Sequence, residues 1–130
     1  MDRQDWQAFA INMALALAGV AMLIFAGWPW EVKAHDALPT SAMPLGWKYD
    51  LACCAGYDCA QLPEGSVKEG PVGYEITLQP GQHPMVKDKA FFSVVPYQSK
   101  QVRSSPDGLF HGCILVSQRM PCLYVPPRGF

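Results

Sequence analysis

The feature that most constrains this chain is an uncharged apolar run of twenty residues near its N-terminus, residues 9–28. Its one polar side chain is that of Asn12. A helix of this length spans about 30 Å, which is the thickness of the hydrocarbon core of a bilayer. Because the run is apolar on every face, it predicts a helix that meets lipid rather than a soluble core. Trp28 and Trp30 suit the headgroup boundary that follows.

Two interpretations of this segment stay open, and both of them export the rest of the chain. In the first, Ala34 ends a small-residue cleavage site, so the mature protein starts at His35 and is periplasmic or secreted. In the second, residues 9–28 remain as an inner-membrane anchor, and the remainder lies outside the cytoplasm. We therefore divide the chain into a signal peptide or membrane anchor, 1–34, and an exported domain, 35–130.

The exported part is neutral in charge and rich in proline, and both properties limit what it can be. It contains 96 residues, in which eight Lys or Arg side chains balance eight Asp or Glu side chains. This balance excludes a general nucleic-acid binder, because such proteins carry an excess of basic side chains. Eleven of the twelve prolines lie here, so we expect only short helices, near residues 50–55 or 85–89.

Four segments carry strand signals. Residues 72–79 alternate between apolar and polar side chains, and residues 91–95 form an apolar run that a proline ends. A turn at residues 105–108 precedes the run 109–116, which is apolar on both faces and is therefore predicted to be a central strand. Residues 122–125 are placed to pair with it as a hairpin. We predict a mainly β fold, a small antiparallel, disulfide-stapled β domain of about four strands, preceded by one N-terminal hydrophobic helix.

All five cysteines follow the apolar segment, and they are Cys53, Cys54, Cys59, Cys113 and Cys122. In an exported domain of this size, each disulfide that closes a long loop adds roughly 2–4 kcal/mol to a small core. Because the count is odd, one thiol is left over. We favour at least one bridge from the 53–59 cluster to Cys113 or Cys122. The competing pairing, Cys113 with Cys122, would close only the hairpin, and the spacing alone does not decide between the two.

A metal site is the alternative use of these residues. The cysteine spacing, CC-x4-C and C-x8-C, matches no paired zinc knuckle. After cleavage, however, the α-amino group and the imidazole of His35 would chelate a divalent ion such as copper or zinc. His111 and the unpaired cysteine are the further ligands that this alternative would use. His83 lies in a Pro/Gly loop, where we expect it to be solvated, and no other cofactor is expected.

Several motifs together resemble a group of small uncharacterised exported proteins, containing cysteines, from Gram-negative bacteria and their phages. The motifs lie within residues 35–130 and are GWKY at 46–49, CCAGYDC at 53–59, SPDG at 105–108 followed by His111 and Cys113, and CLYVPP at 122–127. The resemblance implies export and a single domain, and it implies no activity.

The sequence favours an accessory protein over an enzyme. It contains no GxGxxG, P-loop, GxSxG or HExxH motif, and its carboxylates form no recognisable catalytic pair. We expect a non-enzymatic protein that binds an envelope or virion protein in the periplasm or at the membrane surface. Since aromatic side chains contribute much of the binding energy of interfaces, the expected contact residues are Trp47, Tyr57, Asp58 and Tyr124. The alternative is a small metal-binding or redox protein that uses His35, His111 and the unpaired cysteine.

Overall fold

The computed structural model describes residues 2–26, 34–54 and 56–128. The chain divides into two compact units, Met1–Glu31 and Val32–Phe130. Trp28 and Trp30, which were expected at a membrane boundary, lie outside the described residues.

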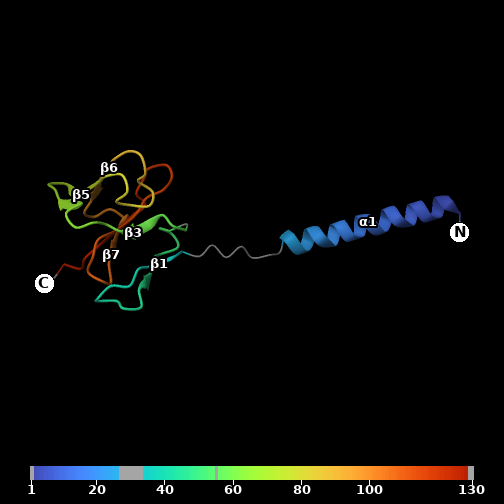
Figure 1. The fold of residues 1–130 in the computed structure, drawn as a ribbon, viewed down its shortest axis with the longest axis horizontal. Helices are drawn as coiled ribbons and strands as arrows, with labels where there is room; N and C mark the ends of the chain where they lie inside the picture. Colours follow the sequence, from blue (N-terminus) through green and yellow to red (C-terminus); the bar gives the residue numbers. More distant parts are fainter. Residues whose placement is uncertain (1, 27–33, 55, 129–130) are drawn as a thin grey trace. The chain divides into compact units, whose positions relative to one another are not determined.

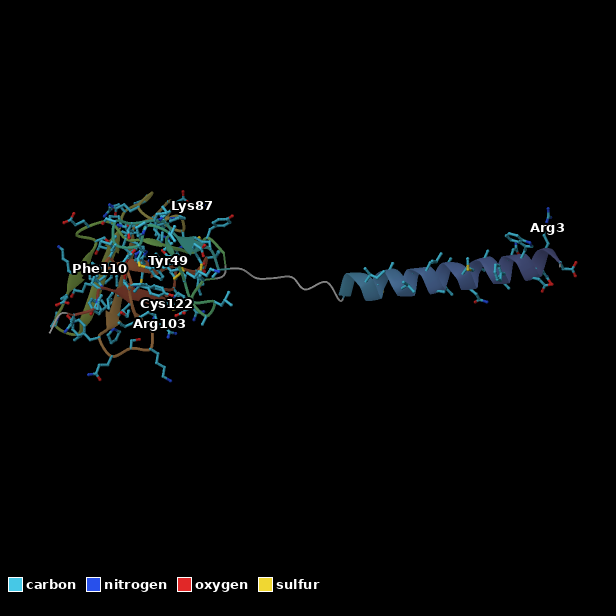
Figure 2. All side chains as sticks on the ribbon, turned by 90° about the horizontal axis from the view of Figure 1, so that it is seen from below. Arg3, Tyr49, Lys87, Arg103, Phe110 and Cys122 are labelled. Atoms are coloured by element: carbon cyan, nitrogen blue, oxygen red, sulfur yellow. A yellow bond between two sulfur atoms is a disulfide. The ribbon has the colours of Figure 1, made fainter. Side chains whose placement is uncertain are left out.

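In the described part of the first unit the chain forms the helix α1 (Arg3–Ala26) (Figure 1). Figure 2 shows side chains of this helix projecting outward along its length. Its stretch Arg3–Met22 is long and apolar enough to cross a membrane, and none of its most apolar window is buried within the protein. The predicted N-terminal hydrophobic helix is therefore confirmed. Because a signal sequence has the same length and composition, this helix fits both interpretations of the segment.

The second unit is built from strands, as predicted. Those found in the described part of the chain are β1 (Asp36–Ala37), β2 (Trp47–Lys48), β3 (Cys59–Gln61), β4 (Val67–Glu69), β5 (Gly73–Leu78), β6 (Phe91–Pro96), β7 (Val102–Ser104), β8 (His111–Cys113) and β9 (Cys122–Val125). They form three sheets, with strand orders β1-β2, β3-β8-β9-β7 and β4-β5-β6. Every pairing is antiparallel except that of β7 with β9. The mainly β, antiparallel class is thus correct, although the strands are shorter and more numerous than expected.

The four-stranded sheet separates two hydrophobic cores, because successive side chains of its strands point to opposite faces. Along β9, Leu123 and Val125 belong to one core, whereas Cys122 and Tyr124 belong to the other. Strand β8 is central and buried at all three positions, as its two apolar faces predicted, and it pairs with β9 as the expected hairpin.

The first core lies between this sheet and the sheet of β4, β5 and β6. The alternation of residues 72–79 predicted β5 correctly, and its side chains Ile76 and Leu78 are fully buried. Burial of each such side chain contributes roughly 1.5–3 kcal/mol. The buried members of this core are Leu62, Tyr74, Ile76, Leu78, Val86, Phe91, Val95, Ile114, Met120, Leu123 and Val125.

The second core contains all five cysteines and several aromatic rings. Its buried members are Ala37, Trp47, Tyr49, Cys53, Cys54, Cys59, Cys113, Cys122 and Tyr124. Two disulfides join the 53–59 cluster to the hairpin, Cys53–Cys122 and Cys59–Cys113. The favoured long-range pairing is therefore confirmed twice, and the competing pairing is wrong. Cys113 and Cys122 face each other across β8 and β9, but each is bonded to the N-terminal cluster instead.

The prediction of short helices near residues 50–55 or 85–89 is wrong for the described residues of these segments, 50–54 and 85–89, which contain no helix. Residues 51–53 form a turn, in which the amides of Cys53 and Cys54 both donate to the carbonyl of Asp50. The disulfide at Cys53 holds the next residues to β9, so the turn does not continue as a helix. The chain also turns at residues 85–89. The Met85 amide donates to the ring of His83, and His83 and Val86 form an isolated antiparallel β-bridge.

Candidate functional site

One buried polar network is centred on the carboxylate of Asp107, in the turn that leads into β8. The turn closes at Gly108, whose φ of +74° is the left-handed conformation that favours glycine. Asp107 accepts hydrogen bonds from Ser105 Oγ at 2.6 Å and from the amide of Leu109 at 3.1 Å. It also accepts from Trp47 Nε1 at 3.0 Å, sixty residues away in the sequence. The carboxylate therefore ties its own turn to β2.

His111 extends this network to Tyr49. Its Nε2 lies 2.9 Å from Asp107 Oδ2, and its Nδ1 lies 2.8 Å from the hydroxyl of Tyr49. Burial, against the raising influence of Asp107, lowers the pKa of His111, so its ring is neutral at pH 7. Burial raises the pKa of Tyr49 as well, so its hydroxyl keeps its proton. Since ionised Asp107 only accepts, Nε2 of His111 carries the proton, and Nδ1 accepts from Tyr49.

The carboxylate of Asp107 is kept ionised by the donors around it. Burial alone would raise its pKa. The hydrogen bonds from Ser105, Trp47 and Leu109 and the proximity of His111 outweigh burial and hold the pKa of Asp107 below its usual value. Every donor in this network thus has an acceptor, and the network orders the second core.

Aromatic rings surround this network. The ring of Trp47 packs edge-on against Tyr49, His111 and Tyr124, with centroid distances of 4.7, 5.0 and 5.1 Å. This packing corrects the expectation that Trp47 and Tyr124 form an exposed contact surface, because their side chains are 9% and 3% exposed. Asp58, expected at the same surface, is also buried. Among the four expected contact residues, Tyr57 alone is exposed, at 81%.

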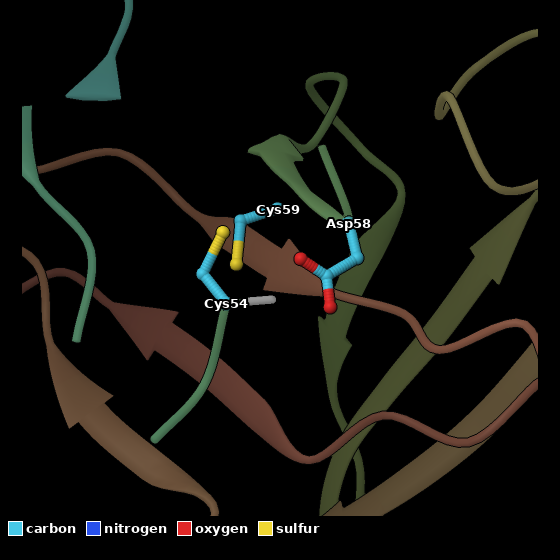
Figure 3. Close-up of side chains that lie close together, drawn as sticks. All are labelled: Cys54, Asp58 and Cys59. Carbon is cyan, nitrogen blue, oxygen red and sulfur yellow. The ribbon is translucent and has the colours of Figure 1, made fainter. Parts of the chain in front are cut away.

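A second polar cluster surrounds the free cysteine, Cys54. Its Sγ lies 3.3 Å from Nδ1 of His35 and 3.1 Å from the carbonyl oxygen of Gly56, to which the thiol donates. The His35 ring nitrogen also contacts that carbonyl oxygen. A carboxylate oxygen of Asp58 and the Sγ atoms of Cys54 and Cys59 all lie within 4.8 Å of one another (Figure 3). The thiol of Cys54 therefore has the His35 ring on one side and the carboxylate of Asp58 nearby, and His35 does not belong to that group of three donor atoms.

The surroundings of Cys54 favour its neutral form when no cation is bound. Burial raises the pKa of the Cys54 thiol, and the nearby carboxylate of Asp58 raises it further. The contacts with Gly56 and His35 act in the opposite direction but are outweighed. A cation placed in this cluster would reverse the balance, because a positive charge stabilises a thiolate.

The nitrogen atoms of His111, which the metal alternative uses as a ligand, are engaged inside the protein. Both ring nitrogens of His111 already have partners, and the Tyr49 ring contacts His111 and His35 alike, with centroid distances of 5.7 and 5.4 Å. The unpaired cysteine does lie beside His35, as that alternative required. The expectation that His83 is solvated is wrong, because its Nε2 bonds the carbonyl oxygen of Gly112 at 3.0 Å inside the protein.

Sequence reasoning missed the role of Asp107 and the polar partner of Tyr49. The SPDG sequence is sufficiently explained as a turn, so it gave no reason to expect a buried carboxylate at its third position. A histidine four residues after Asp107, within a buried apolar run, is the one signal that could have indicated a partner for that carboxylate.

A mostly apolar hollow shares no lining residue with these two clusters. It has a volume of about 580 Å³ and is lined by residues of the 85–92 segment together with Val116 and Gln118. Phe92 and Val116 are exposed there, at 65% and 84%. Lys87, labelled in Figure 2, contributes to the same lining.

The comparisons with known proteins give no family for this chain: no protein-family model, no curated protein and no solved structure matches it.

Proposed function

We propose that this protein is an exported, non-enzymatic accessory protein that binds another protein of the envelope or virion of a Gram-negative bacterium or its phage. The observation that carries the proposal is the pair of long-range disulfides, Cys53–Cys122 and Cys59–Cys113. Disulfides of this kind persist in oxidising compartments such as the periplasm. The apolar helix α1 supports the same location, since a signal peptide or an anchor delivers the domain there.

The hollow lined by Phe92 and Val116 is the contact surface that supports binding. Exposed apolar side chains at one depression mark a place where a partner can bury apolar surface. This surface replaces the expected set around Trp47 and Tyr124, whose side chains already pack in the second core. The partner is a protein that inserts apolar side chains between Phe92 and Val116.

Site-specific photo-crosslinking in the native envelope tests this function. A crosslinkable residue at Val116 or Phe92 is expected to give one discrete adduct, and the substitution V116D is expected to abolish the adduct formed from position 92. Val72 is the matched control, because it is exposed at 66% but does not line the hollow. Equal crosslinking from position 72, or adducts that survive V116D, would contradict the proposed surface.

The location has a separate test. Sequencing the N-terminus of the protein recovered from a membrane-free periplasmic fraction distinguishes the two interpretations. An N-terminus at His35 means that residues 1–34 are a cleaved signal peptide. An intact Met1 in the membrane fraction means that α1 is an anchor, and recovery from the cytoplasm with reduced cysteines would contradict export.

A second candidate function is that of a small metal-binding protein. The contact of Cys54 Sγ with His35 Nδ1 at 3.3 Å favours it, because thiol and imidazole are ligands that zinc and copper share. His111, which this alternative first included, has both ring nitrogens engaged with Tyr49 and Asp107.

A further inference from the structure

We propose that two copies of this protein associate through the free edge of β6, so that one continuous sheet runs across both copies. This inference goes beyond the proposed function and does not rest on it, because it concerns a second copy of the same chain rather than a different protein. Among the strands of the described residues, β5 alone pairs with β6, which leaves β6 at the edge of its sheet. An edge strand presents unpaired amides and carbonyls that another strand can bind.

The direction of the backbone shows which groups of β6 are free. Thr77 of β5 lies opposite Phe92, yet the Thr77 amide donates away from β6, to the carbonyl oxygen of Ser66 at 2.9 Å. Opposite residues of an antiparallel pair either bond each other or both turn away. Phe92 therefore turns its amide and carbonyl outward, and so does Val94, two residues further along the strand. No hydrogen bond from the rest of the described chain reaches these outward groups.

The outward groups of Phe92 and Val94 are complementary to themselves. They lie on either side of Ser93, so a two-fold axis through Ser93 sets Phe92 of each copy opposite Val94 of the other. In this antiparallel register every outward amide of these residues faces a carbonyl oxygen of the second copy. Symmetric dimers are built in this way, from the same surface on both subunits.

The side chains of the edge suit the same register. Phe92 and Val94 are 65% and 39% exposed, whereas Phe91 and Val95, which alternate with them, belong to the first core. Across the two copies Phe92 would lie directly opposite Val94, and such aromatic and β-branched pairs stabilise antiparallel strands. At the axis Ser93 would face itself with the two Cα atoms about 4.5 Å apart, which a small, half-buried side chain permits.

The charges near β6 do not oppose this pairing. The strand, FFSVVP, carries no charged side chain, so no like charges meet at the axis. Lys89 precedes the strand, and the antiparallel register sets it beside the end of the other β6, far from Lys89 of the second copy. Pro96 has no amide, and its carbonyl oxygen already accepts from the amide of Ser99 at 3.0 Å. The pairing is therefore centred on Phe92 and Val94.

A strand of a different protein would find the same backbone groups. The second copy is the favoured occupant because the edge is symmetric about Ser93 and is uncharged there, as a surface that pairs with itself requires. The test distinguishes the two occupants, since only the second copy is present in the purified protein.

The test measures the mass of the full-length chain by sedimentation equilibrium in density-matched detergent, over a range of protein concentrations. Val94→Pro removes an outward amide without removing a bond to β5, and proline is tolerated where a strand's amide faces solvent. Val94→Thr keeps that amide and the β-branched shape. Glu69→Pro is the matched control, because it removes an outward amide from β4, the opposite edge of the same sheet.

We expect a dimer that Val94→Pro weakens at least about tenfold, because the symmetry removes a donor from each copy. Val94→Thr and Glu69→Pro are expected to leave the association nearly unchanged. Intact mass and circular dichroism check that each variant keeps its two disulfides and its fold. A wild-type chain that stays monomeric, or a dimer that Val94→Pro retains at full affinity through α1 or another surface, would overturn the proposal.

Amide hydrogen exchange of the wild-type chain needs no variant and decides the matter if Val94→Pro fails to fold. The amides of Phe92 and Val94 are expected to exchange more slowly as the protein concentration increases, whereas that of Ser93, which faces β5, is expected to exchange at a constant rate. Equally fast exchange of Phe92 and Val94 at every concentration would overturn the second copy as the occupant of this edge. These measurements involve no other protein, so their failure leaves crosslinking from position 116 as a separate test of the hollow. An adduct of two copies has twice the mass of the chain, which distinguishes it from an adduct with another protein.

Discussion

The carboxylate of Asp107 accepts a 2.9 Å hydrogen bond from Nε2 of His111, and both side chains are buried. The contact fixes the tautomer of the histidine ring, which in turn orients the hydroxyl of Tyr49. Trp47 donates to the same carboxylate from β2, so one ionised group links the β1-β2 hairpin to the central strand β8. The second core therefore depends on this charge as well as on its disulfides.

Replacing Asp107 by asparagine is expected to lower the free energy of unfolding by about 3 kcal/mol, because an amide brings N–H donors to a point where several donors already converge. Urea denaturation of the oxidised protein measures the change. Asp88→Asn, an exposed carboxylate, is the control and is expected to have almost no effect. Equal stability of the two variants would show that the network contributes little.

Tyr49→Phe tests the far end of the same network. The substitution removes the hydroxyl that donates to His111 and leaves a buried ring nitrogen without that donor, which costs about 1–3 kcal/mol. Tyr57→Phe is a matched control, because Tyr57 is 81% exposed and loses the same atom. We expect a clear decrease in urea midpoint for the first variant and none for the second; the reverse order would be inconsistent with the tautomer assigned to His111.

The stability of the fold is expected to decrease in acid. Since burial lowers the pKa of His111, the unfolded chain binds this proton more readily than the folded one. The contribution of neutral His111 to the free energy of unfolding is complete above the pKa of an unfolded histidine, near 6.5, and is lost as the pH falls below that value. His83 acts in the same direction, because burial lowers its pKa as well. Asp107 also loses stabilising influence in acid, but at a lower pH, because the donors around its carboxylate lower the pKa of that group.

Thermal melting between roughly pH 8 and pH 5 measures this dependence around the histidine pKa. His111→Gln removes one titrating group, so its melting temperature is expected to fall less steeply with acid than that of the wild type. Parallel slopes for the two proteins would assign the acid sensitivity to His83 or to other groups.

Local pattern predicted the parts of this fold whose causes are local. The alternation through Ile76 and Leu78 identified β5, and the apolar run around His111 identified the central strand. The chain length between cysteines favoured long-range disulfides. What could not be predicted depends on distant segments meeting: Trp47 and Asp107 are sixty residues apart, and His35 lies nineteen residues from Cys54. Such contacts bury polar atoms whose partners are set by the tertiary fold, which periodicity does not encode.

The disulfides are expected to differ sharply from the free cysteine in their effect on stability. Cys53–Cys122 and Cys59–Cys113 join residues 69 and 54 positions apart, so each restricts the unfolded chain by about 4 kcal/mol. Replacing either pair by alanine is expected to lower the free energy of unfolding by about that amount. Cys54→Ala, measured with a chelator present, removes a sulfur without opening a loop and is the control. Urea denaturation compares the three proteins, and a loss for Cys54→Ala as large as that for either pair would contradict the assigned pairing.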